Sequence, residues 1–163
     1  MSLVSIRPAV AQDAGSIARI DSANAAAAQE SAEKPAPRIA YWRDAIEFGE
    51  PQVLVACDGD SIVGFVGYDR SRDPRTPPTM GEIWAIHVVD NYLGQGAGLA
   101  LWDAAREGLL EEGCTHVSIW IELAQERALR FHELAGFKRD MPSLRTTAKG
   151  SKRVEEIRLK RPL

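Results

Sequence analysis

Hydrophobic residues recur along this chain at two spacings, one typical of helices and one typical of strands. The run at 3–8 predicts a short strand that ends at Pro8. Over 12–23 the apolar residues return every three or four positions, which predicts a helix, and a second helix is predicted over 38–48 on the same grounds. The alanine-rich stretch 24–37 lies between them, and we expect its Pro35-Ala36-Pro37 ending to break any helix.

The middle of the chain predicts a β-hairpin followed by a buried strand. Residues 53–57 and 62–68 are β-rich runs around Asp58-Gly59-Asp60, which has the Asp-Gly chemistry that hairpin turns favour. Residues 69–81 are rich in proline and charge, which predicts a loop. Apolar residues then occupy both alternation sets of 82–89, so this strand is expected to be buried on both faces.

The second half of the chain alternates helices and strands. Helices are predicted over 98–112 and 125–135, each followed by a glycine, with a strand over 117–121 between them. Because a helix connects two strands here, the strands at 82–89 and 117–121 are expected to lie parallel in the centre of a sheet. From Phe137 onward we expect two final strands, the second over 154–160, that flank a polar loop.

The composition fits one ordered domain of mixed α/β or α+β class over residues 1–163. Of the 163 residues, 45% are hydrophobic and the formal net charge is only -3, which excludes a disordered chain. No apolar run is long enough to span a bilayer, and the first residues lack the apolar core of a signal peptide. We therefore expect a cytoplasmic protein with no membrane partner, and the mild acidity argues against a nucleic-acid partner.

The cysteines and histidines do not suggest a metal site. Cys57 and Cys114 are far apart and show no paired spacing, so neither a zinc site nor a disulfide framework is implied. The three histidines, His87, His116 and His132, also lack the spacing of metal ligands. We expect no bound metal.

A glycine-rich turn at 91–99 has the strongest functional pattern of the sequence. It lies between a predicted strand and a predicted helix, so its backbone N–H groups and the positive end of the helix dipole form a candidate phosphate cradle. No Lys-Ser or Lys-Thr follows the glycines, which excludes a Walker loop, and the spacing fails the dinucleotide-binding fingerprint. The alternative is that the glycines only allow close helix packing.

The order of elements and several segments resemble the GNAT superfamily of acyl-CoA-dependent N-acyltransferases. The resemblance covers essentially the whole chain and rests on Ile6-Arg7-Pro8-Ala9, EIWAIHV at 82–88, NYLGQGAGLALWDAA at 91–105 and ERALRFHELAGF at 126–137. It implies a mixed, centrally parallel sheet of about six to seven strands flanked by about four helices.

The resemblance also implies a binding site for coenzyme A. The family signature is Arg or Gln, two residues, Gly, one residue, then Gly or Ala; Gly96 and Gly98 fit it, whereas Leu93 departs from the Arg/Gln position. The backbone N–H groups expected to hold the pyrophosphate belong to Gly94, Gln95, Gly96, Ala97, Gly98 and Leu99. The backbone of Ile86, His87 and Val88 is expected to pair with the pantetheine arm, and the N–H of Val88 to polarise the thioester carbonyl. Gln125 takes the position of a family Asn that contacts the cofactor.

Two residues are candidates for proton transfer. Glu82 matches a position where some family members place a general base, and the alternative is a solvated glutamate at a strand start. His132 takes the position of a Tyr that protonates the departing thiolate in many members, and the alternative is a half-buried structural histidine. His87, Trp42, Trp84 and Trp120 are more consistent with core positions, although Trp42 lies in the region that usually walls the acceptor site.

The function that we predict is an acetyl-CoA-dependent N-acetyltransferase that uses direct transfer in a ternary complex. Neither cysteine falls at a motif position, which disfavours a covalent acyl-enzyme. The acceptor is expected to be a small-molecule or peptide amine, selected by the loops at 24–37, 69–81 and 138–153, and a homodimer is possible. A second hypothesis is a non-catalytic acyl-CoA sensor, because Leu93 and His132 depart from the family pattern. A third hypothesis is a nucleotide- or NAD-binding domain that uses the glycine turn.

Overall fold

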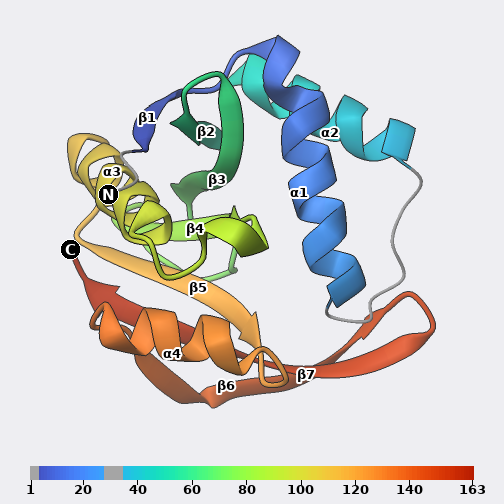
Figure 1. Cartoon of the computed structure of the whole chain (residues 1–163). Helices are drawn as coiled ribbons and strands as arrows, with labels where there is room; N and C mark the ends of the chain where they lie inside the picture. Colours follow the sequence, from blue (N-terminus) through green and yellow to red (C-terminus); the bar gives the residue numbers. More distant parts are fainter. Residues whose placement is uncertain (1–3, 28–34) are drawn as a thin grey trace.

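The described part of the protein, residues 4–27 and 35–163 of a computed structural model, contains one seven-stranded mixed sheet (Figure 1). Its strand order is β1-β2-β3-β4-β5-β7-β6, in which only the central β4–β5 pair is parallel. The strands are β1 Ser5–Pro8, β2 Gln52–Asp58, β3 Ser61–Arg70, β4 Met80–Val88, β5 His116–Glu122, β6 Lys138–Lys149 and β7 Lys152–Pro162. The predicted mixed sheet with a parallel centre is confirmed.

Four α-helices cover the two faces of this sheet in the described residues: α1 Ala14–Ala27, α2 Pro35–Phe48, α3 Ala97–Glu111 and α4 Glu126–Leu134. Alternate residues of β2 point to opposite faces, which divides the core into two clusters. Val53 and Val55 pack with the buried residues of α1 and α2, whereas Ala56 packs with those of α3 and α4. Burial of both sheet faces explains why the β2–β3 hairpin is almost continuously apolar.

The parallel pair β4–β5 is short, and this determines the shape of the centre. Only Met80–Glu82 pairs with His116–Ser118, after which the two strands diverge. Within the strand predicted over 82–89, only Glu82 and Ile83 are therefore fully buried, and Trp84 to Val89 are half-buried. The prediction that this strand is buried on both faces along its whole length is wrong, because beyond Glu82 one edge of β4 has no neighbouring strand in the described sheet.

The prolines at 35 and 37 begin a helix instead of breaking one. Helix α2 starts at Pro35, so both prolines lie in its first turn. The N–H groups of a first turn have no partner within the helix, and proline therefore costs nothing there. The first helix also runs further than predicted, to Ala27, and the rest of the alanine-rich stretch, 28–34, lies outside the described residues.

The two final strands predicted after Phe137 are confirmed as β6 and β7, but the loop predicted over 138–153 is wrong, because β6 fills most of that range. Its side chains are mostly exposed, and β6 is the edge strand of the sheet, so no apolar alternation marked it in the sequence. Two of its basic residues are paired with acids of other strands: Arg145 Nε donates to Glu156 at 2.8 Å, and Lys149 Nζ to Glu122 at 2.7 Å. Arg145 and Lys149 therefore lie on a paired strand.

Candidate active site

The glycine-rich turn forms an open cradle of backbone donors before α3. Gly94 and Gly96 have φ of +75° and +91°, and a Cβ at either position would meet no atom within 4 Å. These are left-handed conformations that glycine adopts without strain. Within the described chain, no hydrogen-bond acceptor is paired with the backbone N–H groups from Gly94 to Leu99. Unpaired donors at the positive end of a helix suit a phosphate group.

Gly98 has a different role from its neighbours. A Cβ at Gly98 would lie 3.2 Å from Cε1 of Phe131, on α4, so this glycine permits close packing of α3 against α4. Both interpretations of the glycines therefore hold, at different residues. Gln95 donates from Nε2 to the Asn91 carbonyl at 2.8 Å, which braces the turn, and the Leu99 side chain is exposed beside it.

The open edge of β4 lies next to this cradle. Val89 N–H donates to Val63 of β3, and since N–H directions alternate along a strand, those of Ile86 and Val88 point to the opposite side, toward β5. The β4–β5 ladder ends at Glu82 and Ser118, so these two N–H groups have no strand partner there. They are available to an extended ligand lying between the diverging strands, whereas the His87 backbone is used by β3.

Glu82 lies at the start of β4, is 1% exposed and is fully paired with Arg72. One carboxylate oxygen accepts from the Arg72 backbone N–H at 2.9 Å and the other accepts from its Nη2 at 2.7 Å. Arg72 lies in the loop after β3 and stacks on the Trp84 ring at 4.0 Å from its centroid. Glu82 is thus not the solvated glutamate of the alternative interpretation. It does not line the pocket described below, but its partner Arg72 does.

His132 is 4% exposed in the last turn of α4. Its Nδ1 lies 2.8 Å from the Ala128 carbonyl and must donate to it, since a carbonyl only accepts, and its ring contacts Phe131 and Phe137 edge-on. Burial lowers the pKa of His132, partly offset by the Ala128 hydrogen bond, so the ring is neutral at pH 7. This environment favours the structural interpretation over that of a proton donor.

Gln125 is half-buried at the start of α4, and its side chain makes no capping hydrogen bond.

His87 points from β4 toward α1, against Phe65 and Asp21. The Asp21 Oδ1 atom lies 3.8 Å from His87 Nε2, and Oδ2 accepts hydrogen bonds from Arg38 and from Trp42 Nε1. Burial lowers the pKa of His87 to about 4, and the Asp21 carboxylate only partly opposes this.

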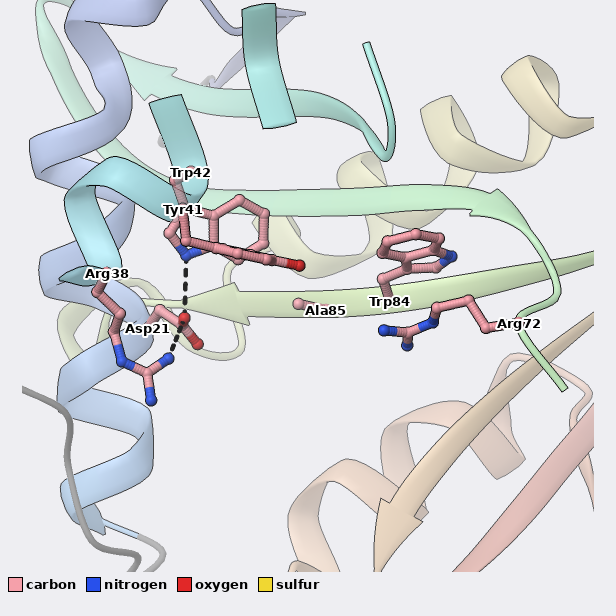
Figure 2. A pocket seen from close by; sticks show the side chains of 7 residues that line it. All are labelled: Asp21, Arg38, Tyr41, Trp42, Arg72, Trp84 and Ala85. Atoms are coloured by element: carbon pink, nitrogen blue, oxygen red, sulfur yellow. Dashed lines mark hydrogen bonds and ion pairs between the residues drawn. The ribbon is translucent and has the colours of Figure 1, made fainter. Parts of the chain in front are cut away.

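A pocket of about 310 Å³ lies on the α1–α2 side of β4 (Figure 2). Its lining residues are Asp21, Arg38, Tyr41, Trp42, Arg72, Trp84 and Ala85. A β-bulge shapes it: Gly67 pairs with Ala85 and Tyr68 with Ile83, so Trp84 is an extra residue in β4. The bulge turns both Trp84 and Ala85 toward the pocket. Trp42 is buried, as predicted, but Trp84 and Trp120 are only half-buried.

Sequence reasoning missed most of this pocket. Asp21 and Arg38 lie on different helices and Arg72 lies in the proline-rich loop, so no local spacing connects them. Two lining residues fall in regions that the sequence associated with the acceptor: Trp42 by the resemblance, and Arg72 as part of the loop at 69–81. Within residues 4–27 and 35–163, no group of three or more His, Cys, Asp or Glu side chains is arranged to hold a metal ion. No helix in that same part of the chain is long and apolar enough to cross a membrane.

Comparison with protein families gives a match to the acetyltransferase (GNAT) family over residues 18–137. Curated relatives include mycothiol acetyltransferases: that of Sanguibacter keddieii is 36% identical over 106 residues, or 64% of this chain and 32% of that protein. That of Propionibacterium freudenreichii subsp. shermanii is 33% identical over 91 residues, or 55% and 28%. The chain thus spans less than a third of the length of these relatives.

Solved structures show the same fold over nearly all of the chain. Ribosomal-protein-alanine N-acetyltransferase from Brucella melitensis has a TM-score of 0.80 at 19% identity, covering 98% of this chain and 99% of that one. A protein of Salmonella typhimurium, solved with its cofactor acetyl-CoA, has a TM-score of 0.79 at 18% identity, covering 98% and 94%. At these identities the likeness concerns the fold alone.

Proposed function

Because the chain belongs to the acetyltransferase (GNAT) family, we propose that it transfers an acetyl group from acetyl-CoA to a primary amine by direct attack in a ternary complex. One observation carries the proposal. The unpaired N–H groups of Gly94 to Leu99 lie next to the open edge of β4, which offers the N–H groups of Ile86 and Val88. Together they can bind a ligand with a phosphate group at one end and an extended amide arm at the other.

The backbone performs most of the binding and polarisation in this proposal. The cradle holds the pyrophosphate of acetyl-CoA, so Leu93 at the Arg/Gln position of the signature removes one side-chain donor and leaves the backbone donors intact. The N–H groups of Ile86 and Val88 pair with the pantetheine arm and polarise the thioester carbonyl, where negative charge develops during attack. Gln125, at the N-cap of α4, supplies an amide to the same ligand.

Glu82 is the proton acceptor for the amine, acting through water. An amine with a pKa of ~10.4 is mostly protonated at pH 7 and must lose a proton before its nitrogen can attack. The new C–N bond then displaces the CoA sulfur as a thiolate, which with a thiol pKa of ~8.5 is a good leaving group and takes a proton from solvent. We assign His132 a structural role, because its Nδ1 is bound to Ala128 and its ring is buried.

Neither cysteine is suited to form an acyl-enzyme intermediate. Cys57 and Cys114 are both buried, and burial raises the pKa of the Cys114 thiol, which disfavours the reactive thiolate. Neither cysteine lines the pocket beside β4. Action in the cytoplasm, and as a homodimer, stays a prediction.

The first test is ligand binding. Acetyl-CoA at about 100 times its Kd should stabilise the chain by roughly 2.7 kcal/mol, and CoA should act similarly while NAD should not. Turnover is then measured as release of the CoA thiol with a panel of amines. Lack of stabilisation by acetyl-CoA would contradict the proposal.

Glu82→Gln separates an enzyme from a non-catalytic sensor. Gln keeps a hydrogen-bonding group beside Arg72 but cannot accept the proton, so turnover should fall by about 100-fold or more with the Kd for acetyl-CoA unchanged. Glu47→Gln, at an exposed position of α2, is the matched control and should change neither. Tight acetyl-CoA binding with no turnover on any amine would favour the sensor.

A further inference from the structure

The pocket beside β4 presents charges of both signs that balance one another. Asp21 pairs with Arg38. Arg72 pairs with Glu82, a buried residue that does not itself line the pocket. Figure 2 shows the Asp21–Arg38 pair at one end of the pocket and the Arg72–Trp84 stack at the other, with Ala85 of β4 between them. With Glu82 counted, the charges around the pocket balance, and the lining offers a carboxylate, Asp21, at one end and a guanidinium, Arg72, at the other. A ligand matched to it carries both an ammonium and an anionic group.

Asp21 keeps one oxygen available at its end of the pocket. Its Oδ2 accepts from both Arg38 and Trp42 Nε1, which fixes the orientation of the carboxylate. Its Oδ1 has His87 Nε2 at 3.8 Å and no hydrogen bond from the described residues. A carboxylate held in this way is a preorganised acceptor for an ammonium group.

Arg72 keeps a donor available at the other end. Its Nε and Nη2 are directed to Glu82, and its guanidinium lies on the Trp84 ring at 4.0 Å, so three contacts fix its plane. Nη1 makes no hydrogen bond within the described chain, and the side chain is 51% exposed. A half-exposed guanidinium of fixed orientation is a strong site for a carboxylate.

Resting on the function proposed above, we propose that the acceptor is a small zwitterion, an amine that also carries a carboxylate. Its ammonium group lies over Ala85 within reach of Asp21, its carboxylate binds Arg72, and the rings of Tyr41 and Trp84 contact its carbon skeleton. The 310 Å³ volume is at the small end for small-molecule sites, which fits a single amino-acid-sized molecule. A polyamine would need a net negative pocket, and the N-terminus of a peptide has no carboxylate beside its amine.

The test compares free amino acids with their carboxamides as acetyl acceptors. The two share the amine and the side chain and differ in the carboxylate, and the lower amine pKa of the amide leaves more free base at pH 7. A preference for the acid therefore cannot come from nucleophile availability. We expect wild-type kcat/KM for the best acid to exceed that of its amide by about 10-fold or more, the size of one charge-assisted interaction.

Two variants assign the preference to residues. Arg72→Gln should lower kcat/KM for the acid about 10- to 100-fold and remove the acid-over-amide preference, whereas Asp21→Asn should lower acid and amide alike, because both carry the ammonium group. Arg72→Lys, which keeps the charge beside Glu82, should retain part of the preference. Arg75→Gln, an exposed arginine of the same loop outside the pocket, is the control and should change nothing.

The outcomes distinguish this inference from the proposed function. Equal rates for acid and amide in the wild type, or an undiminished preference in Arg72→Gln, would overturn the zwitterion and leave the acetyltransferase intact. If the chain binds acetyl-CoA and acetylates no amine, both the function and the inference fall. The readout is the ratio of kcat/KM for acid and amide, because Arg72→Gln also removes the side-chain partner of Glu82 and so lowers turnover on both acceptors. A ratio that falls to about one in Arg72→Gln, and is partly kept in Arg72→Lys, supports the inference.

Discussion

Acidification from pH 7.5 to 5.0 is expected to destabilise this protein through His87. The pKa of His87 is lowered by burial from 6.5 to about 4, so between these values the unfolded chain binds a proton that the folded chain does not. Stability therefore rises with pH across this window and is lost as the pH falls. For one site with these two pKa values, the free energy of unfolding at pH 5.0 is lower than at pH 7.5 by about 2 kcal/mol.

His132 acts in the same direction, because burial also lowers its pKa. The acids with lowered pKa, Asp13 and Asp140, are held ionised by Arg7 and Arg158 and protonate only at still lower pH. The interval from 7.5 to 5.0 thus isolates the two histidines whose pKa is lowered, His87 and His132. A loss of about 2 kcal/mol is large for a domain whose total stability is 5–15 kcal/mol.

Urea unfolding at both pH values measures the effect. With a slope of about 1–3 kcal/mol per molar urea, 2 kcal/mol moves the midpoint by roughly 1 M. In His87→Gln the shift between the two pH values should shrink by that amount and leave only the His132 contribution. His116→Gln, at an exposed position, should behave like the wild type. If His87→Gln shows the full wild-type pH dependence, the placement of His87 against Phe65 and α1 is wrong.

Two glycine substitutions probe the turn before α3, and their expected results differ. Gly96→Ala imposes a side chain at φ +91°, so we expect a loss of about 1 kcal/mol in stability and weaker acetyl-CoA binding by calorimetric titration. An unchanged affinity would argue against the cradle. Gly98→Ala places a Cβ 3.2 Å from Phe131, so its loss of stability should be smaller in a Phe131→Leu background. Strict additivity of the two changes would contradict the packing role.

The sequence predicted best those features whose cause is local. The turn at 91–99 is marked by its own glycines, and the hairpin by Asp58-Gly59, so the fold and the candidate cradle followed from short segments. The length of β6 was underestimated because an edge strand needs no apolar face, and its residues show their pairing only beside Glu122 and Glu156. Helix α2 was placed late because prolines in a first turn carry no penalty.

The pocket was beyond sequence reasoning for a different reason. Asp21, Arg38 and Arg72 come from α1, α2 and the loop after β3, and their meeting depends on how two helices pack on the sheet. The bulge at Trp84, which brings Trp84 and Ala85 to the same side, depends on the register between β3 and β4. Neither has a signature in any window of neighbouring residues. Glu82 and His132 were found by position, but their environments came only from the structure.

The early end of the β4–β5 ladder also has a mechanical consequence. Only three residue pairs, between Met80–Glu82 and His116–Ser118, join β4 to β5. Beyond them the sheet is split into two parts, one of β1 to β4 and one of β5, β7 and β6. A ligand arm that hydrogen-bonds to the edge of β4 takes the position of an absent strand. Binding of the ligand therefore stiffens the sheet between β4 and β5. Restraining the two parts of the sheet opposes binding and so lowers the affinity for such a ligand. A sheet in which β4 and β5 were paired along their whole length would have no open edge for the ligand.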